Sequence, residues 1–200
     1  MDLPDIQPSI KTGKEQFFIG KPDLNIPLLD FWQWNQSNLI ENRTRGILAE
    51  FIVMKAFEVE SKARVEWDDF DIITDQDIKI EVKSSAFIQT WEQTKFSSID
   101  FSIGPSKRYL ETPGRPADRL RPSDIYVFAL LAHKEQKTID PMNLNQWCFF
   151  VMSSRKIDAE RGPQQRITLN SLKSLSPIEC NYQNLKTTVE KIIKNENYSN

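Results

Sequence analysis

The chain has 200 residues, of which 39% are hydrophobic and 27% charged, a composition typical of one globular domain and unlike that of disordered chains. Its 26 Lys and Arg against 28 Asp and Glu give a net charge of -2, which excludes a histone-like polycation. The single histidine, His133, argues against most zinc enzymes and histidine-based triads. If the protein is an enzyme, carboxylates and lysines must therefore carry the chemistry.

The two cysteines, Cys148 and Cys180, have neither a metal-ligand spacing nor a disulfide pattern. We therefore expect a cytoplasmic protein in a reducing compartment. The first residues include no basic segment followed by a long apolar run, so we expect no signal peptide and no membrane span.

Residues 1–33 contain four prolines, which predict an irregular segment covering a core formed by residues 34–200 of one domain. From about Ser37 to Phe57 no proline interrupts the chain, and the apolar run within it is too long for a strand. This pattern predicts a helix, with Ser37 or Asn35 as its cap.

A β-hairpin is predicted next. Phe70–Thr74 has the composition of a strand, Asp75–Asp77 that of a turn, and Ile78–Ser85 alternates strictly between apolar and polar residues. A three-residue turn places Asp71 opposite Glu81 on the same face of the hairpin.

The remaining elements complete a mixed architecture. Strands are predicted at 97–103, 124–133 and 146–153, and a terminal helix at 185–194. The long, proline-rich connection 104–122 is typical of a functional loop. The order of these elements predicts an α/β fold with a single mixed central sheet flanked by helices.

Glu50 falls on the mostly apolar stripe of the predicted helix, where an unpaired charge is unfavourable. Gly46, one turn earlier, leaves space for something to approach. Two interpretations remain open: Glu50 is paired with Arg43 or Lys83 in the interior, or it faces a cation that the sequence does not contain.

The hairpin brings acids together. Directly opposed Cβ atoms lie only ~5 Å apart, so Asp71 and Glu81 would repel each other unless a cation sits between them or one is protonated. Oxygen-rich clusters of this kind suit Mg²⁺ or Mn²⁺. The alternative is an amphipathic hairpin with a solvated, salt-bridged face.

An acidic residue two positions before a lysine occurs four times, so the tripeptide alone has little value. Only Glu81-Val82-Lys83 lies in mid-strand with an acid-rich partner strand upstream. Asp77 and Lys79 form a rival pair on the same strand face, but they adjoin the turn.

Together, helical Glu50, Asp71 at the start of an apolar strand and the Glu81-x-Lys83 strand resemble the PD-(D/E)xK nuclease superfamily, which has the restriction-endonuclease-like fold. The resemblance implies that Asp71 and Glu81, with the Val82 carbonyl, ligate Mg²⁺, for which Mn²⁺ would substitute. It further implies that Lys83 orients or activates the attacking water and that Glu50 ligates or supports a second ion.

The sequence departs from the family pattern because no proline precedes the first acid. Asp69 therefore remains an alternative metal ligand. We favour Asp71, because the strand residues Ile72 and Ile73 continue directly from it.

Candidate DNA contacts follow the predicted catalytic strand. Gln89 and Gln93 could read base edges, and Trp91 could stack on a base or belong to the core. In the loop 104–122, five basic residues against Glu111 and Asp118 leave an excess of +3. These basic residues are Lys107, Arg108, Arg115, Arg119 and Arg121.

The sequence thus predicts a metal-dependent nuclease that hydrolyses DNA phosphodiester bonds, with a restriction or defence endonuclease as one such role. A homodimer is expected only by analogy with other nucleases of this fold. The competing hypothesis is a non-catalytic nucleic-acid-binding or scaffold protein that keeps the fold. A third is an unrelated hydrolase that acts through carboxylates.

Overall fold

The computed structural model describes residues 2–4, 6, 8–21, 23–60, 63–64, 69–111, 113–114, 116 and 119–197, without the side chains of residues 23, 108 and 197. The chain divides into two compact units. Residues 1–39 and 60–67 form the smaller unit, and residues 40–59 and 68–200 form the larger one.

The smaller unit contains regular structure where an irregular segment was predicted. Strands β1 (Gln16–Phe18) and β2 (Asp23–Pro27) pair antiparallel, and helix α1 (Leu28–Gln36) follows directly. Pro27, at the N-cap with φ -74°, begins the helix instead of breaking it, because its missing N–H is not needed there. The irregular assignment was therefore wrong for residues 16–18 and 23–33, whereas the described residues before Gln16 belong to no helix or strand. The covering role of residues 1–33 stays a prediction.

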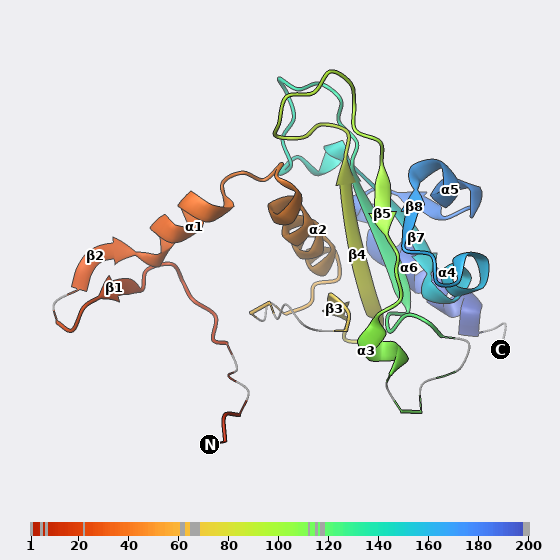
Figure 1. The fold of residues 1–200 in the computed structure, drawn as a ribbon, viewed down its shortest axis with the longest axis horizontal. Helices are drawn as coiled ribbons and strands as arrows, with labels where there is room; N and C mark the ends of the chain where they lie inside the picture. Colours follow the sequence, from red (N-terminus) through yellow and green to blue (C-terminus); the bar gives the residue numbers. More distant parts are fainter. Residues whose placement is uncertain are drawn as a thin grey trace. The chain divides into compact units, whose positions relative to one another are not determined.

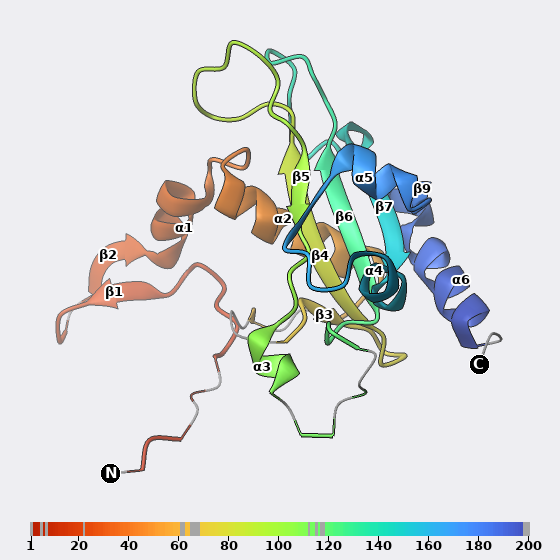
Figure 2. The ribbon, with the colours of Figure 1, turned by 45° about the vertical axis from the view of Figure 1, so that its right-hand side comes forward.

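The larger unit is built on one mixed five-stranded sheet, visible in Figures 1 and 2. The strands lie in the order β3-β4-β6-β7-β9; β4 and β6 are parallel, and the other neighbours are antiparallel. Their bounds are β3 (Ile72–Ile73), β4 (Lys79–Ala86), β6 (Ile125–Leu131), β7 (Trp147–Ser153) and β9 (Ile178–Cys180). The predicted α/β class with a mixed central sheet is confirmed.

One face of this sheet packs against two helices. Helix α2 (Asn42–Ala56) contributes Ile52 and Val53, and helix α6 (Leu185–Asn197) contributes Val189, to the same buried cluster. The even-numbered apolar residues of β4 belong to this cluster. The odd-numbered residues of β4 consequently point to the opposite face.

The opposite face has its own cluster beneath a small two-stranded sheet and two helices. Strands β5 (Asp100–Ser102) and β8 (Arg166–Thr168) pair antiparallel, and helices α4 (Ser154–Arg161) and α5 (Leu169–Ser174) complete this layer. Three short turns also occur: α3 (Lys107–Leu110), η1 (Leu144–Gln146) and η2 (Tyr182–Asn184). Within the described ranges, no helix combines the length and apolar character needed to cross a membrane.

Helix α2 begins later than the sequence predicted. Its N-cap is Glu41, whose carboxylate accepts hydrogen bonds from the backbone N–H groups of Arg43 and Thr44, each at 3.0 Å. These bonds lower the pKa of Glu41, since they favour its charged form. The predicted caps Ser37 and Asn35 were therefore wrong, because a carboxylate further along satisfies the first free N–H groups.

A buried ion pair ties the second layer together. Arg121 has no exposed surface and is paired with Asp158, whose side chain is 4% exposed. The Arg121 Nε also donates to the Ile103 carbonyl at 2.7 Å, and its Nη2 to the Gly162 carbonyl at 3.1 Å. A completely buried guanidinium cannot contact a phosphate, so the predicted DNA contact at Arg121 is corrected to a structural role.

Replacing Asp158 by Ala should destabilise the fold by about 3–5 kcal/mol, because Arg121 would keep a buried charge without its counter-ion. Asp100→Ala is the control. The ion pair of Asp100 with Arg166 is more exposed, so removing it should lower the free energy of unfolding by less than about 1 kcal/mol. Urea denaturation of the two variants measures both values. An equal loss of unfolding free energy in the two variants would contradict the structural role of the buried Arg121–Asp158 pair.

Candidate active site

The carboxylate of Asp71 lies against the edge of strand β4. Pairing of Ile72 with Ile80 places Asp71 alongside Glu81, as the alternation predicted. The Asp71 N–H donates to the Ile80 carbonyl at 3.1 Å, and its Oδ2 accepts a hydrogen bond from the Val82 N–H at 2.7 Å. The side chain therefore takes the place of a strand neighbour beyond the end of β3.

The same edge presents a backbone acceptor. The N–H and C=O of one strand residue point to the same side of the strand, so the Val82 carbonyl faces the edge that Asp71 occupies. Among the strands that the structure describes, none pairs with this edge of β4 after Ile80. The Val82 carbonyl is thus placed where an oxygen ligand was predicted.

Glu81 and Lys83 form an ion pair on the odd-numbered face of β4. Their side chains are 18% and 27% exposed, respectively. Burial disfavours the charged amine of Lys83, yet the carboxylates of Glu81 and Asp71 outweigh it and raise the pKa of Lys83. Lys83 is accordingly a cation at neutral pH, not a free base.

The surroundings of Asp71 disfavour its charged form. Burial, followed by repulsion from Glu81 and then Glu50, raises the pKa of Asp71 from 3.8 to about 7, although Lys83 and the Val82 N–H oppose the shift. Glu50 reaches this site from helix α2, where it is half-buried. Glu81 and Glu50 are therefore each close enough to repel Asp71, and Lys83 is close enough to interact with all three acids.

The oxygen ligands of this site suit a hard cation such as Mg²⁺, but their side chains are not arranged around a common point. In the part of the chain that the structure describes, no three carboxylate, histidine or cysteine side chains are gathered as an ion-binding group. Glu81 is held by Lys83, and Asp71 by the Val82 N–H. The carboxylates and the Val82 carbonyl nevertheless provide oxygen ligands in a negatively charged place, as Mg²⁺ requires.

The other acids near the hairpin are placed differently. Asp69 is half-buried, two residues before Asp71, and remains the alternative ligand. Asp77 lies in the turn with φ +59°, and the Lys79 amine lies 5.6 Å from the centre of the Phe70 ring. A Cβ atom at Gly46 would meet no atom outside the adjoining backbone of α2 within 4 Å, so there is open space beside it.

The two glutamines predicted to read bases are engaged inside the protein. Gln89 is 8% exposed; its Nε2 donates to the Ala86 carbonyl at 2.9 Å, and its backbone N–H donates to Gln93 Oε1 at 2.7 Å. The Gln93 Nε2 donates to the Phe87 carbonyl at 3.2 Å. Both amides hold the loop after β4, and no free base-reading edge is evident for Gln89.

The basic loop is less exposed than its sequence implies. Lys107 is exposed, whereas Arg119 is largely buried, donates to the Ser123 carbonyl at 2.6 Å and pairs with Asp124 at 3.4 Å. Arg115 and the side chain of Arg108 lie outside the described residues. Among the described basic residues of this loop, Lys107 alone presents an exposed side chain.

Sequence reasoning missed Arg45, a buried side chain of α2 that is 3% exposed. Its Nε donates to Ser84 Oγ at 3.2 Å, and its Nη1 donates to the Ile40 carbonyl at 2.9 Å and to Gln89 Oε1 at 3.4 Å. Burial lowers the pKa of Arg45 to about 10. Ser84 and Gln89 lie 39 and 44 residues away in the sequence, so the local pattern around Arg45 gave no signal for its contact with β4 and the following loop.

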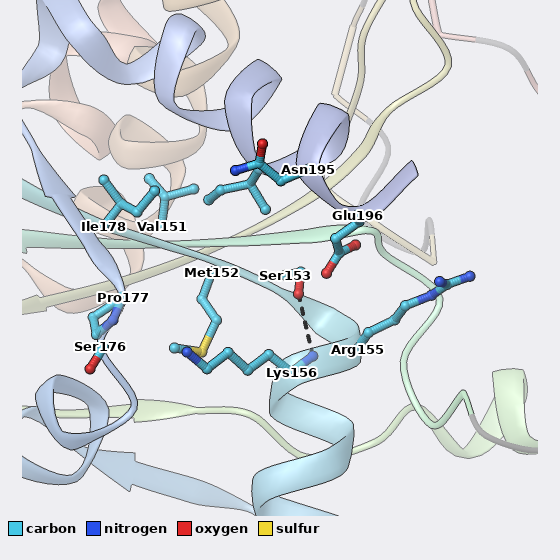
Figure 3. A pocket seen from close by; sticks show the side chains of 11 residues that line it. Val151, Met152, Ser153, Arg155, Lys156, Ser176, Pro177, Ile178, Asn195 and Glu196 are labelled. Atoms are coloured by element: carbon cyan, nitrogen blue, oxygen red, sulfur yellow. Dashed lines mark hydrogen bonds between the residues drawn. The ribbon is translucent and has the colours of Figure 1, made fainter. Parts of the chain in front are cut away.

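A surface hollow of about 450 Å³ lies elsewhere on the larger unit (Figure 3). Its lining includes one acid, Glu196, and the N-terminal end of α4, where Ser153 Oγ accepts a hydrogen bond from the Lys156 N–H. Met152, in the lining, is separated from Glu81 by the intervening strand β6. We assign this hollow no part in the chemistry. Its residues are Val151, Met152, Ser153, Arg155, Lys156, Ser176, Pro177, Ile178, Ile192, Asn195 and Glu196.

Comparison with known proteins gives one finding. A family model described as bacteriophage T4 endonuclease IV matches residues 28–171, a span that includes Glu50, Asp71, Glu81 and Lys83. The chain belongs to the bacteriophage T4 endonuclease IV family. No curated protein and no solved structure matches the chain.

Membership of the endonuclease IV family supports the nuclease activity predicted from the sequence. The family description names neither a metal ion nor a fold, so these assignments depend on the residues themselves. The matched span ends before helix α6, and it contains both β4 and the helix that carries Glu50.

Asp71→Asn should stabilise the metal-free protein near neutral pH and above, and change its stability little at about pH 4. In the unfolded chain the carboxyl loses its proton near 3.8, but in the folded protein only near 7. Wild-type stability should therefore fall as pH rises between these values, and remain reduced above about pH 7. Asparagine can still accept the Val82 hydrogen bond.

Urea denaturation with EDTA, from about pH 4 to pH 8, measures this difference. Asp75→Asn, in the exposed turn, is the matched control and should show no such pH dependence. A stability difference between wild type and Asp71→Asn that is the same at every pH would show that the environment of Asp71 has been misjudged.

Proposed function

We propose that the protein is a metal-dependent endonuclease that hydrolyses DNA phosphodiester bonds at the open edge of β4, with a restriction-endonuclease-like core of the PD-(D/E)xK type. The observation that carries this proposal is the placement of Asp71 against the Val82 N–H, beside the Glu81–Lys83 pair. Membership of an endonuclease family supports the reaction class.

Three oxygen donors would hold the ion: the carboxylates of Asp71 and Glu81 and the carbonyl of Val82. Mg²⁺ is the expected cation, and Mn²⁺ should substitute for it. Glu50 would act as a further ligand or support a second ion. When bound, the ion makes water a stronger nucleophile and offsets charge developing on the phosphate.

Lys83 would then act as a charged group. Because its pKa is raised, its ammonium is suited to donate hydrogen bonds to a non-bridging oxygen of the scissile phosphate and to orient the attacking water. The ion pair places this ammonium beside Glu81, so the phosphate and the ion would be bound next to each other. A proton acceptor other than Lys83 is needed for the attacking water, such as bulk water or the phosphate itself.

The substrate and assembly are also proposals. Among the described basic residues of the loop 104–122, Lys107 is the exposed one and could meet a DNA backbone. A restriction or defence role suits a nuclease of this length, and a homodimer would allow both strands to be cut. Action in the cytoplasm is the expected setting.

A non-catalytic nucleic-acid-binding protein is the second candidate, because the acids are not gathered around one point. In that case Glu81 and Lys83 would serve only as a structural ion pair on β4. Retention of Glu50, Asp71, Glu81 and Lys83 together favours the enzyme.

Glu81→Gln and Lys83→Ala should each lower the rate of Mg²⁺-dependent plasmid cleavage by at least about 10²-fold while the proteins stay folded. The first change removes a charged ligand, and the second removes the cation beside the phosphate. The assay is incubation of plasmid and single-stranded DNA with each variant and Mg²⁺ or Mn²⁺.

Matched controls come from the rival pair on the same strand. Asp77→Asn and Lys79→Ala alter an acid and a lysine at the turn end of β4, and both should cleave at nearly the wild-type rate. Undiminished cleavage by Glu81→Gln or Lys83→Ala would overturn the assignment, and loss in all four variants would indicate a folding effect.

Binding of a divalent ion should also be visible without catalysis. At about ten times its Kd, Mn²⁺ should stabilise the wild-type protein by about 1.4 kcal/mol, a rise in Tm of roughly 3–5 °C. Asp71→Asn should lose this shift, while Asp69→Asn should keep it if Asp71 is the ligand. The reverse pattern would assign the ion to Asp69, and no shift in wild type would favour the non-catalytic candidate.

A further inference from the structure

The loop of residues 87–97, which directly follows β4, presents two aromatic side chains to solvent. Trp91 is 55% exposed and Phe96 is 51% exposed. The loop extends beyond the end of the β4 arrow and is coloured yellow-green in Figure 1. In the described part of the chain, no aromatic ring or cation stacks on Trp91.

Hydrogen bonds hold this loop in one shape. The Phe87 carbonyl accepts a bond from the Ser97 N–H at 3.0 Å, which closes the loop at its base. Within it, Gln93 accepts from the Gln89 N–H and donates to the Phe87 carbonyl and to Ser97 Oγ, the last at 3.0 Å. A single glutamine therefore braces both arms, so Trp91 is displayed by an ordered loop.

The loop is also tied to the helix that carries Glu50. Gln89 Oε1 accepts from Arg45 Nη1 of α2, and the same guanidinium donates through Nε to Ser84 Oγ, the residue after Lys83. Arg45 thus links the loop to the catalytic strand. The position of the loop is coupled by these contacts to that of the candidate active site.

The loop also contains a contact between Phe87 and Phe96, and the amine of Lys134 lies against both rings. Phe87 and Phe96 meet edge to face with centroids 6.1 Å apart, and the Lys134 amine lies 4.4 Å and 5.6 Å from these two rings. Lys134 is exposed, as is Lys95 within the loop. Exposed aromatic rings interspersed with cations are the surface chemistry that binds single-stranded nucleic acid.

We infer that the loop 87–97 is a stacking platform on which Trp91 binds one unstacked nucleobase of the DNA substrate, an inference that rests on the proposed nuclease function. Gln89 and Gln93 are positioning residues for this platform rather than base-reading residues. Base stacking on an aromatic side chain is tolerant of sequence and contributes affinity at a single nucleotide.

Strand β4 separates the stacking loop from Lys83, the residue proposed to contact the scissile phosphate. Lys83 and Ala86 are three residues apart on β4, a span of about 10 Å. The loop begins beyond this span, so the stacked base is a neighbour further along the DNA strand and not the nucleotide at the scissile phosphate. Such a base comes from single-stranded DNA or is flipped out of a duplex.

Binding is measured in the Glu81→Gln background, which prevents cleavage, with single-stranded and duplex oligonucleotides of about 12 nucleotides. Trp91→Ala should weaken binding about 5- to 150-fold, and Trp91→Phe should weaken it much less because a ring remains. Gln93→Ala should give an intermediate loss with Trp91 still present. A loss confined to single strands indicates a single-stranded source, and a loss in both indicates flipping.

Oligonucleotides with one abasic site, moved a nucleotide at a time, provide the decisive measurement. At one position the abasic site should weaken binding by the protein with Trp91 but not by the Trp91→Ala protein, because the stacking partner is already missing. The matched control is Trp34→Ala, since Trp34 is another exposed tryptophan, 82% exposed, in the smaller unit.

Several outcomes would overturn the platform. These are unchanged affinity in Trp91→Ala, an equal loss in Trp34→Ala, or a Trp91→Ala loss that no abasic position abolishes. If the protein binds DNA and cleaves it but shows one of these results, the platform alone is wrong. Absence of both binding and cleavage would instead reject the nuclease function.

Discussion

The hydrogen bond from the Val82 N–H to the Asp71 carboxylate is the contact on which the site depends. It replaces a backbone partner by a side chain, so pairing of β3 with β4 ends there, and the Val82 carbonyl faces an edge with which no described strand pairs. The same bond holds a carboxylate beside Glu81 in a largely buried place, which raises the pKa of Asp71. A single hydrogen bond therefore both ends the pairing of β3 with β4 and holds the Asp71 carboxylate in the candidate site.

Helix α2 and strand β4 together position the acids proposed for catalysis and the loop proposed for base stacking. Glu50 acts electrostatically on Asp71 near the beginning of the strand, while Arg45 holds Ser84 and the following loop near its end. Parallel pairing with β6 holds β4 from Ile80 to Ala86. The acids and the exposed aromatic loop are thus held on a common support at a fixed separation.

The hairpin and its register were predictable because the alternation of Ile78–Val82 and the short turn Asp75–Asp77 allow one arrangement that buries the apolar residues. Arg121 was misjudged because its counter-ion, Asp158, lies 37 residues away, and local charge cannot reveal such a pair. Pro27 was taken as evidence for irregular structure, but it stands at the start of α1. There its fixed φ is compatible with the helix, and its missing N–H is not needed. Local pattern thus identified the candidate acids, whereas long-range contacts decided which cations stay exposed.

No described strand pairs with the Asp71 side of β4 beyond Ile80, and this has a further consequence for the behaviour of the protein in solution. An unpaired strand edge can add a strand from another chain and so begin aggregation. Here Asp71 covers part of the edge, and the charged side chains of Glu81 and Lys83 stand beside it. The groups proposed for catalysis consequently also protect the sheet against self-association, which makes apolar substitutions there a risk to solubility as well as to activity.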